Sequence, residues 1–279
     1  ALGLRLAEET RADLVLGTDP DGDRLGVGVR HGGAYRLLTG NQIGALLVRF
    51  VCETAREPIT SADTLVKTVV TGGLGAAVAA SYGASVEDTL TGFKYIGRRA
   101  VELEKSGNRR FLMGYEESYG YLVGTHARDK DATVAALLIA ELAAKEKSAG
   151  RTLVDALDAL HAAHGFFLDA LDAVTLPGAR GEAEIAAAMA RLRSADASVL
   201  GAGCRTLDYQ TGLDGLPAEN LVKFAFPDGS WAAVRPSGTE PKLKLYYSAR
   251  GAAEAQAQAR LASLRTLLLD ILQLPGGHI

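Results

Sequence analysis

The stretch TLVKTVVTGGLGAAVAASYGASVEDTL, residues 64–90, contains an apolar segment, an alanine-rich segment and a second apolar segment in turn. The β-branched run 64–71 predicts a buried strand, residues 72–83 have helical composition and end at a glycine, and residues 84–90 return to a strand pattern. A strand, a crossing helix and another strand form the βαβ unit of a parallel sheet. This stretch therefore predicts a layered α/β fold.

The segments around this unit continue the alternation of helices and strands. Residues 41–55, 92–107 and 131–147 have helical patterns, and RRFLMGYE at 109–116 reads as a strand. We therefore expect a layered α/β domain with a mainly parallel sheet over residues 41–150.

The two ends of the chain have different patterns. Residues 1–40 read as a helix followed by short strands, which we interpret as the end of a further domain. Residues 151–164 predict a linker helix. Residues 165–279 contain strands in hairpins with helices gathered apart from them, which predicts a smaller α+β domain with an antiparallel sheet.

Composition limits the class of protein. The length of 279 residues predicts roughly two domains, and 48% hydrophobic residues suffice for real cores. A net charge of −3 gives no reason to expect nucleic acid or an anionic membrane as partner, and no apolar run reaches the length of about 20 residues that spans a membrane. Two isolated cysteines, Cys52 and Cys204, favour free thiols in a cytoplasmic protein over a disulfide framework.

The loop GTDPDGDRLG, residues 17–26, is the first chemical motif. Its carboxylates stand at alternate positions, at Asp19, Asp21 and Asp23. A calcium EF-hand loop is excluded because its sixth and twelfth positions would be Arg24 and Arg30. Three hard oxygen ligands match Mg²⁺, and Arg24 beside them suggests a phosphate shared between metal and guanidinium. A solvated acidic turn is the alternative.

The second motif is RPSGTEPKLKLYY, residues 235–247. It combines a guanidinium, two hydroxyls and a glycine at Arg235, Ser237, Gly238 and Thr239. Together these groups can form a cradle for an anion, with Lys242 and Lys244 adding positive charge. An inert turn is the alternative for this motif.

The third motif, GYEESYGY at residues 114–121, follows the predicted strand that ends at Glu116. Its carboxylates and Ser118 suit the hydroxyls of a sugar, because parallel sheets bind ligands at the carboxyl ends of their strands. By itself this motif is weak and fits a solvated loop better than a sugar site. Lys94, which opens a predicted helix, is a weaker candidate because such a lysine is usually a surface residue.

The three motifs in this order resemble the α-D-phosphohexomutase family, which includes phosphoglucomutases and phosphomannomutases, over almost the whole chain. The resemblance implies that Asp19, Asp21 and Asp23 hold Mg²⁺ with Arg24 close to the metal-bound phosphate. It implies that the sugar is discriminated by Glu116 and Ser118, with Tyr115 in place of the usual glycine. The implied phosphate loop consists of Arg235, Ser237, Gly238 and Thr239. Lys94 matches a loop that lines the same cleft.

Lys130 falls where some phosphoglucomutases place a candidate general base. Burial and the neighbouring Arg128 could lower its pKa and so favour that role.

By the same resemblance, residues 1–40 would be the remnant of the metal-binding domain, 41–150 the sugar-binding domain and 165–279 the phosphate-binding domain. The substrates would be a hexose phosphate and a hexose bisphosphate. The family's Thr-Ala-Ser-His-Asn-type loop, whose serine is phosphorylated, is not found in the sequence. We therefore expect the chain to need the missing N-terminal segment of the enzyme as a partner and to lack turnover by itself.

Several functions fit these motifs. Glu-Glu-Ser at 116–118 is the glucose-type form of the sugar loop, which favours a phosphoglucomutase; phosphomannomutase and phosphopentomutase are alternatives within the family. A non-catalytic sugar-phosphate-binding module is an alternative from another class. A phosphatase with Asp19 as nucleophile is disfavoured because such enzymes need a free, apolar-flanked aspartate at a strand end, whereas here the acids form a cluster.

Overall fold

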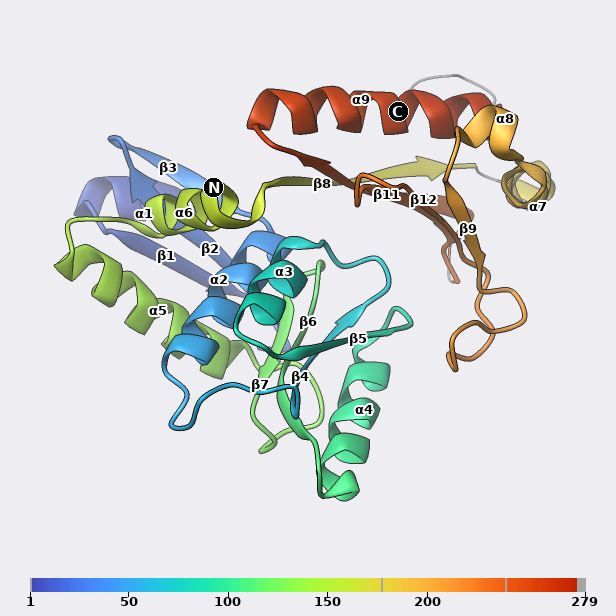
Figure 1. Cartoon of the computed structure of the whole chain (residues 1–279). Coiled ribbons are helices and arrows are strands. Elements are labelled where there is room, and N and C mark those ends of the chain that lie inside the picture. Colours follow the sequence, from blue (N-terminus) through green and yellow to red (C-terminus); the bar gives the residue numbers. More distant parts are fainter. Residues whose placement is uncertain (1, 177, 239, 275–279) are drawn as a thin grey trace. The chain divides into compact units, whose positions relative to one another are not determined.

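The computed structural model describes residues 2–176, 178–238 and 240–274 (Figure 1). The chain divides into two compact units, Ala1–His164 and Gly165–Ile279. Residues 1–40 lie within the first of these units, and the predicted division into four parts stays a prediction. Within the described residues, no helix has the length and apolar character that crossing a membrane requires.

The first unit begins with a small antiparallel sheet in the order β1-β2-β3. Its elements are α1 (Leu2–Thr10), β1 (Leu14–Thr18), β2 (Leu25–His31) and β3 (Ala34–Leu38). All five residues of β1 pair with the first five residues of β2, from Leu14 opposite Val29 to Thr18 opposite Leu25. The aspartate loop is the connection between these two strands.

The rest of the first unit is a layered α/β structure, as predicted. Its elements are α2 (Gly40–Glu53), β4 (Asp63–Thr68), α3 (Leu74–Ser81), β5 (Ser85–Thr89), α4 (Phe93–Ser106), β6 (Arg110–Glu116), β7 (Gly120–Val123), α5 (Ala132–Ser148) and α6 (Leu153–His164). The sheet has the order β5-β4-β6-β7, with β4 parallel to β5 and to β6. The βαβ unit expected at 64–90 is therefore present.

Helices cover both faces of this sheet. On one face, α4 packs Ile96 and Leu103 against Val66 and Phe111. Two successive residues of β6 point to the two faces of the sheet. Gly114 faces Ile96 of α4, whereas the buried Tyr115 ring lies against α2 and α3 on the other face. Only β7 runs antiparallel, because β6 and β7 form a hairpin through residues 117–119. This hairpin brings the third motif to the carboxyl end of β6.

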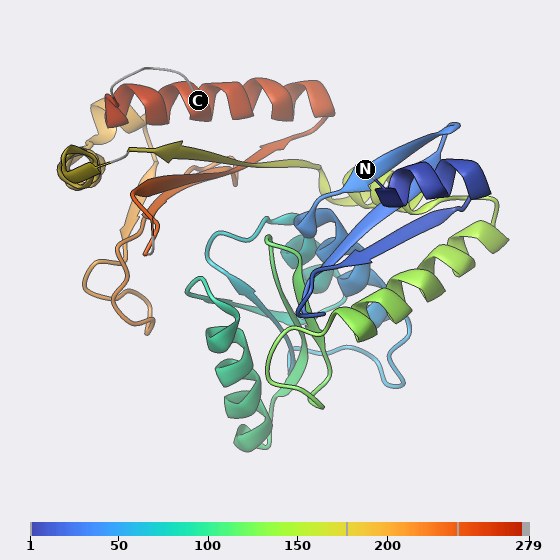
Figure 2. The same cartoon turned by 180° about the vertical axis from the view of Figure 1, so that it is seen from behind.

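The second unit is an α+β structure with a fully antiparallel sheet, also as predicted. Its elements are β8 (Phe166–Thr175), α7 (Gly178–Ser194), α8 (Ala197–Leu200), β9 (Arg205–Asp208), β10 (Val222–Ala225), β11 (Trp231–Pro236), β12 (Lys242–Gly251) and α9 (Glu254–Leu272). The sheet order is β8-β12-β11-β10-β9. Helix α9 runs along this sheet in both views (Figures 1 and 2), and its Leu264 and Leu268 join a core with Val234 and Leu245.

Candidate functional site

The aspartate loop is held together by its first carboxylate. Asp19 Oδ1 accepts hydrogen bonds from the backbone N–H groups of Asp23 at 3.1 Å and Arg24 at 3.2 Å. Burial acts to raise the pKa of Asp19, but these backbone bonds, the Asp23 side chain and the Arg24 charge together outweigh it, and the net pKa is lowered. The Asp21 side chain is exposed at the tip of the loop. Asp19 thus remains a carboxylate and fixes the backbone on which the other two acids stand.

Asp23 faces a lysine from a distant part of the sequence. Its Oδ2 lies 3.0 Å from Lys130 Nζ, while its Oδ1 is buried and has no hydrogen-bond partner among the described residues. Arg24 Nε lies 3.8 Å from both Asp19 Oδ2 and Asp23 Oδ1. The loop therefore combines a pair of carboxylates with two cationic groups.

The three predicted metal ligands do not form a ligand cluster in this structure. Within residues 2–176, 178–238 and 240–274, no group of three or more His, Cys, Asp or Glu side chains is arranged to hold a metal. Asp19 is turned to backbone amides and Asp23 to Lys130, since charged oxygens at a partly buried position need partners. The donor chemistry still fits Mg²⁺, because Asp23 Oδ1 is a buried carboxylate oxygen that a cation would satisfy.

Lys130 is fixed from several sides. It immediately precedes Asp131, the N-cap of α5, and its ammonium also lies 3.0 Å from Asp129 Oδ1. A Cβ on Gly120 would lie 2.4 Å from Lys130 Cδ, so the side chain passes over β7 only because residue 120 is glycine. The ammonium lies 5.4 Å from the ring centroid of Phe93. These contacts direct the lysine toward the aspartate loop.

The expectation that burial and Arg128 could lower the pKa of Lys130 is wrong for this structure. Burial does act in that direction, but hydrogen bonds to the Asp129 and Asp23 carboxylates outweigh it and the net pKa is raised. The Arg128 guanidinium is directed elsewhere and pairs with Glu104 at 2.8 Å. Sequence proximity alone did not show which neighbour the lysine meets.

The turn between β6 and β7 lies directly beside the aspartate loop. The Leu25 N–H donates to the Tyr119 carbonyl at 3.0 Å, and Arg24 forms an antiparallel bridge with Gly120. Glu116 is 8% exposed at the end of β6, and Ser118 is exposed in the turn. Arg24 of the first motif and Glu116 of the third motif are 92 positions apart in the sequence. The two motifs are nevertheless neighbours in space.

Glu116 also joins the segment that carries Lys94. Its Oε1 accepts the Gly92 N–H at 2.8 Å, immediately before α4. Burial raises the pKa of Glu116, and the backbone hydrogen bond from Gly92 only partly offsets it. The Lys94 side chain is exposed, with its ammonium 5.0 Å from the Tyr95 ring centroid. The structure therefore brings Lys94's loop to the same site, as an exposed rim.

A buried polar cluster at the end of β4 was not predicted from the sequence. Lys67 is 6% exposed, and its ammonium lies 2.7 Å from Asp88 Oδ1. The hydroxyls of Thr68 and Thr71 lie 3.4 and 3.3 Å from Glu117 Oε2, beside Glu116. A lysine within a segment predicted to be a buried strand was the available signal, because a buried charge needs a partner.

The second motif lies in the second unit. Arg235 stands near the end of β11, where its Nε donates to Glu219 Oε1 at 2.9 Å. The Ser237 N–H donates to the Lys242 carbonyl at 2.7 Å, which closes the hairpin from β11 to β12. A Cβ on Gly238 would meet nothing within 4 Å, so this part of the loop is open. The predicted residue Thr239 lies outside the described residues.

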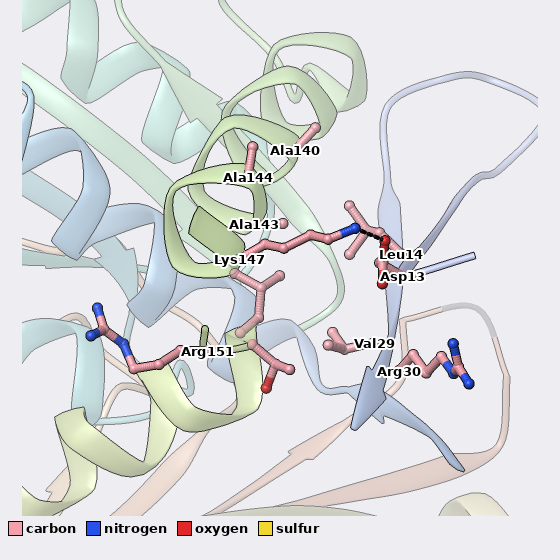
Figure 3. A pocket seen from close by; sticks show the side chains of 11 residues that line it. Asp13, Leu14, Val29, Arg30, Ala140, Ala143, Ala144, Lys147 and Arg151 are labelled. Atoms are coloured by element: carbon pink, nitrogen blue, oxygen red, sulfur yellow. Dashed lines mark hydrogen bonds and ion pairs between the residues drawn. The ribbon is translucent and has the colours of Figure 1, made fainter. Parts of the chain in front are cut away.

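A cavity of about 250 Å³ lies elsewhere in the first unit (Figure 3). Ala140 and Ala144 of α5 line it opposite Leu14 and Val29 of the small sheet. Lys147 reaches from α5 to Asp13 at a distance of 2.5 Å. None of the predicted site residues lines this cavity.

Two family models match the chain. Residues 39–162 match the alpha/beta/alpha domain III of phosphoglucomutase/phosphomannomutase, and residues 127–262 match the C-terminal domain of the same family.

Curated relatives and solved structures agree with these matches. A phosphoglucomutase of Staphylococcus epidermidis is 38% identical over 261 residues, which cover 88% of this chain and 46% of that protein. A phosphoglucomutase of Staphylococcus aureus is 34% identical over 259 residues, with the same coverage of 88% and 46%. The chain spans about half the length of these curated relatives.

Among solved structures, parafusin, a phosphoglucomutase from Paramecium, matches with a TM-score of 0.76 at 21% identity, over 94% of this chain and 45% of that one. A putative phosphomannomutase from Thermus thermophilus matches with a TM-score of 0.61 at 22% identity, over 96% of this chain and 49% of that one. At these identities the two structures show a shared fold.

Proposed function

The chain belongs to the phosphoglucomutase/phosphomannomutase family, and on this basis we propose that it carries the sugar and phosphate sites of a phosphosugar mutase. The proposed substrates are a hexose phosphate and its bisphosphate. Glu-Glu-Ser at 116–118 favours glucose over mannose and pentose phosphates, and the relatives named phosphoglucomutase support that preference. Because the chain spans about half of those relatives, turnover by the whole protein is part of the proposal.

The observation that carries the proposal is the contact between the aspartate loop and the β6–β7 turn. Lys130 lies against Gly120, the first residue of β7 after the turn, and 3.0 Å from Asp23 of the loop. Phosphoryl transfer to a sugar needs acceptor hydroxyl, proton carrier and charge-stabilising groups within a few ångströms of one another. The contact supports the proposal because it brings Lys130 and the aspartate loop next to the turn that follows Glu116.

Each residue has a proposed role. Glu116 accepts hydrogen bonds from sugar hydroxyls, and Ser118 adds a hydroxyl at the open side of the turn. Lys130 takes the proton of the attacking hydroxyl while the hydroxyl oxygen forms its bond to phosphorus and the bond from phosphorus to the donor oxygen breaks, with the electron pair staying on that donor oxygen. To do so it must first give up its proton and loosen its pairs with Asp23 and Asp129. Arg24, largely exposed beside the loop, binds the phosphate being transferred.

Asp19, Asp21 and Asp23 are the residues that would hold Mg²⁺. Bound there, the ion would neutralise charge on the phosphate oxygens. The exposed Asp21 would turn toward a cation without breaking a contact to any residue in the described part of the chain, whereas Asp23 would exchange its contact with Lys130. In the second unit, Arg235 and the Ser237–Gly238 backbone would bind the non-reacting phosphate.

Binding measurements test the proposal without requiring turnover. We would titrate the 279-residue chain with glucose 1-phosphate, glucose 6-phosphate, mannose 1-phosphate and ribose 5-phosphate in the presence of Mg²⁺. Glucose phosphates should bind most tightly, and Glu116→Ala should remove the preference among sugars while leaving the affinity for inorganic phosphate unchanged. Tighter binding of the mannose or ribose ester would assign the other family activity. Absence of binding for all four esters would contradict the proposal.

A further inference from the structure

Arg235 is held by an acidic side chain from a different loop. Its Nε lies 2.9 Å from Glu219 Oε1, and the two side chains are 24% and 21% exposed. We propose that Glu219 is a positioning residue that orients the Arg235 guanidinium for phosphate. This inference rests on the proposed role of Arg235 in phosphate binding.

The geometry of the guanidinium supports this role. Arginine presents five N–H donors in a planar fork, with one edge at Nε and a second edge between the two terminal nitrogens. Glu219 contacts the Nε edge, so the terminal edge can still make the paired hydrogen bonds that phosphate accepts. A carboxylate in this place selects one orientation of a side chain that otherwise samples many rotamers.

Glu219 itself is rigidly placed. Its N–H donates to the Tyr209 carbonyl at 2.9 Å, and its carbonyl accepts the Leu221 N–H at 2.8 Å. The Tyr209 N–H in turn donates to Leu221 at 3.0 Å, so the base of the loop from β9 to β10 is closed by backbone bonds. The next residue, Asn220, accepts a hydrogen bond from Arg193 Nη2 at 2.7 Å. A carboxylate on such a base can hold another side chain in place.

The same carboxylate carries a cost, because its charge repels a phosphate. Lys244, directly opposite Arg235 in the register of β11 and β12, supplies positive charge that offsets it, whereas Lys242 near the turn is itself paired with Glu240 at 3.1 Å. The orienting contact of Glu219 should therefore strengthen phosphate binding, whereas its negative charge should weaken it. Substitutions that remove the charge and keep the contact can separate these two effects.

The test compares Glu219→Gln with Glu219→Ala in the full 279-residue chain. Glutamine keeps an oxygen acceptor for Nε but removes the negative charge, whereas alanine removes both. We expect Glu219→Ala to weaken binding of glucose 6-phosphate about three- to tenfold, the usual cost of ordering one long side chain on binding. Glu219→Gln should bind as tightly as wild type or up to a few-fold more tightly.

Two controls accompany the variants. In an Arg235→Ala background, Glu219→Ala should cause no further loss, because its effect acts through Arg235. Asp228→Asn removes an ion pair of similar length, 2.8 Å to Arg260, at the opposite end of β11 and should leave phosphate affinity unchanged. Melting temperatures of all variants identify any general loss of folding.

The outcomes separate the two levels of the proposal. If Arg235→Ala weakens binding but Glu219→Ala does not, the positioning role is overturned and the phosphate role stands. Tighter binding by both Glu219 variants would also overturn it, because the carboxylate would then only mask charge. If Arg235→Ala itself has no effect, the proposed phosphate site and the inference drawn from it both fail.

Discussion

Lys130 Nζ lies 3.0 Å from Asp23 Oδ2, so the proposed general base is in contact with a proposed metal ligand. The lysine is 14% exposed and the aspartate 28%, which makes this a partly shielded pair. An ammonium and a divalent cation cannot occupy the same side of one carboxylate without repulsion. Binding of Mg²⁺ and the position of Lys130 should therefore depend on each other.

Removing the ammonium should strengthen metal binding. We expect Lys130→Met to raise the affinity for Mn²⁺ or Mg²⁺ roughly fivefold, since an ion pair of this exposure contributes about 1 kcal/mol. Titration calorimetry measures the change. Lys145→Met, which breaks the exposed 2.7 Å pair with Glu53, is the matched control and should leave the affinity unaltered. Equal affinities for Lys130→Met and wild type would show that the two cations do not compete.

The exposed acid of the loop, Asp21, should contribute to the metal site although no contact with the residues that the structure describes holds it in place. We expect Asp21→Asn to weaken Mn²⁺ binding about tenfold by removing one charged oxygen ligand, with unchanged melting temperature. Asp13→Asn is the control, because Asp13 is also exposed, precedes the same hairpin and pairs only with Lys147 at 2.5 Å among the described residues. A metal titration that is identical for Asp21→Asn and wild type would rule out the loop as a three-carboxylate site.

The affinity for the sugar phosphate should decrease at acidic pH. Burial raises the pKa of Glu116 above the usual 4.5, so its neutral form persists to a higher pH than in an exposed glutamate. Only the carboxylate accepts hydrogen bonds with both oxygens. The affinity for glucose 6-phosphate should therefore fall as the pH drops through this raised pKa. Glu116→Gln should bind more weakly at pH 7 and lose that part of the pH dependence; an unchanged profile would exclude Glu116 as the hydroxyl acceptor.

The first unit should lose stability in acid through Asp63. This carboxylate is 5% exposed, and hydrogen bonds from Arg110 Nε at 2.7 Å and from Thr60 lower its pKa despite its burial. A lowered folded pKa means that the stabilisation is present above the unfolded value near 3.8 and is lost as the pH falls through the folded value.

We expect Asp63→Asn to lower the free energy of unfolding by about 1–3 kcal/mol at pH 7. The variant should also lose less stability than wild type between pH 4 and pH 2 (roughly the range in which an aspartate titrates). Urea denaturation at several pH values measures both effects. Glu57→Gln, which removes the 77% exposed partner of the same arginine at 3.5 Å, should change little.

The close packing of Gly44 against the Tyr115 ring should leave no room for a methyl group. A Cβ on Gly44 of α2 would lie 2.3 Å from the ring of Tyr115, which is fully buried and also meets Gly75 of α3. We expect Gly44→Ala to lower the free energy of unfolding by about 1–3 kcal/mol through overpacking. Chemical denaturation tests this, with Gly17→Ala as a control because nothing lies within 4 Å of its Cβ position.

The fold class was predictable because its signals are local. The apolar run at 64–71 predicts a strand, and the alanine-rich segment that ends at Gly83 predicts a helix. The order of such strands and helices along the chain then favours parallel pairing of the strands. Strand β7 was not predicted as an element of its own. Its four residues, Gly120–Val123, are too few for a periodic pattern, and their strand conformation depends on pairing with β6.

The candidate site was predictable as motifs but not as contacts. The sequence showed Asp23 and Lys130 separately, and their pairing depends on the start of α5 meeting the β1–β2 loop in space. Tyr115 shows the same limit. As part of the third motif it was expected in the sugar loop, whereas the alternation of side chains along β6 turns it into the core between α2 and α3.

Hydrogen exchange of the Leu25 amide, which donates to the Tyr119 carbonyl, can report on the separation of two segments of the first unit. Leu25 is fully buried, and its N–H forms a backbone link between the aspartate hairpin and the sugar loop, next to the bridge between Arg24 and Gly120. Its exchange with deuterated solvent requires these two segments to separate, so its rate measures how often the site opens. A ligand that bridges both segments should slow this one amide more than amides inside α4, and that difference would follow site closure in solution without a label or a catalytic assay.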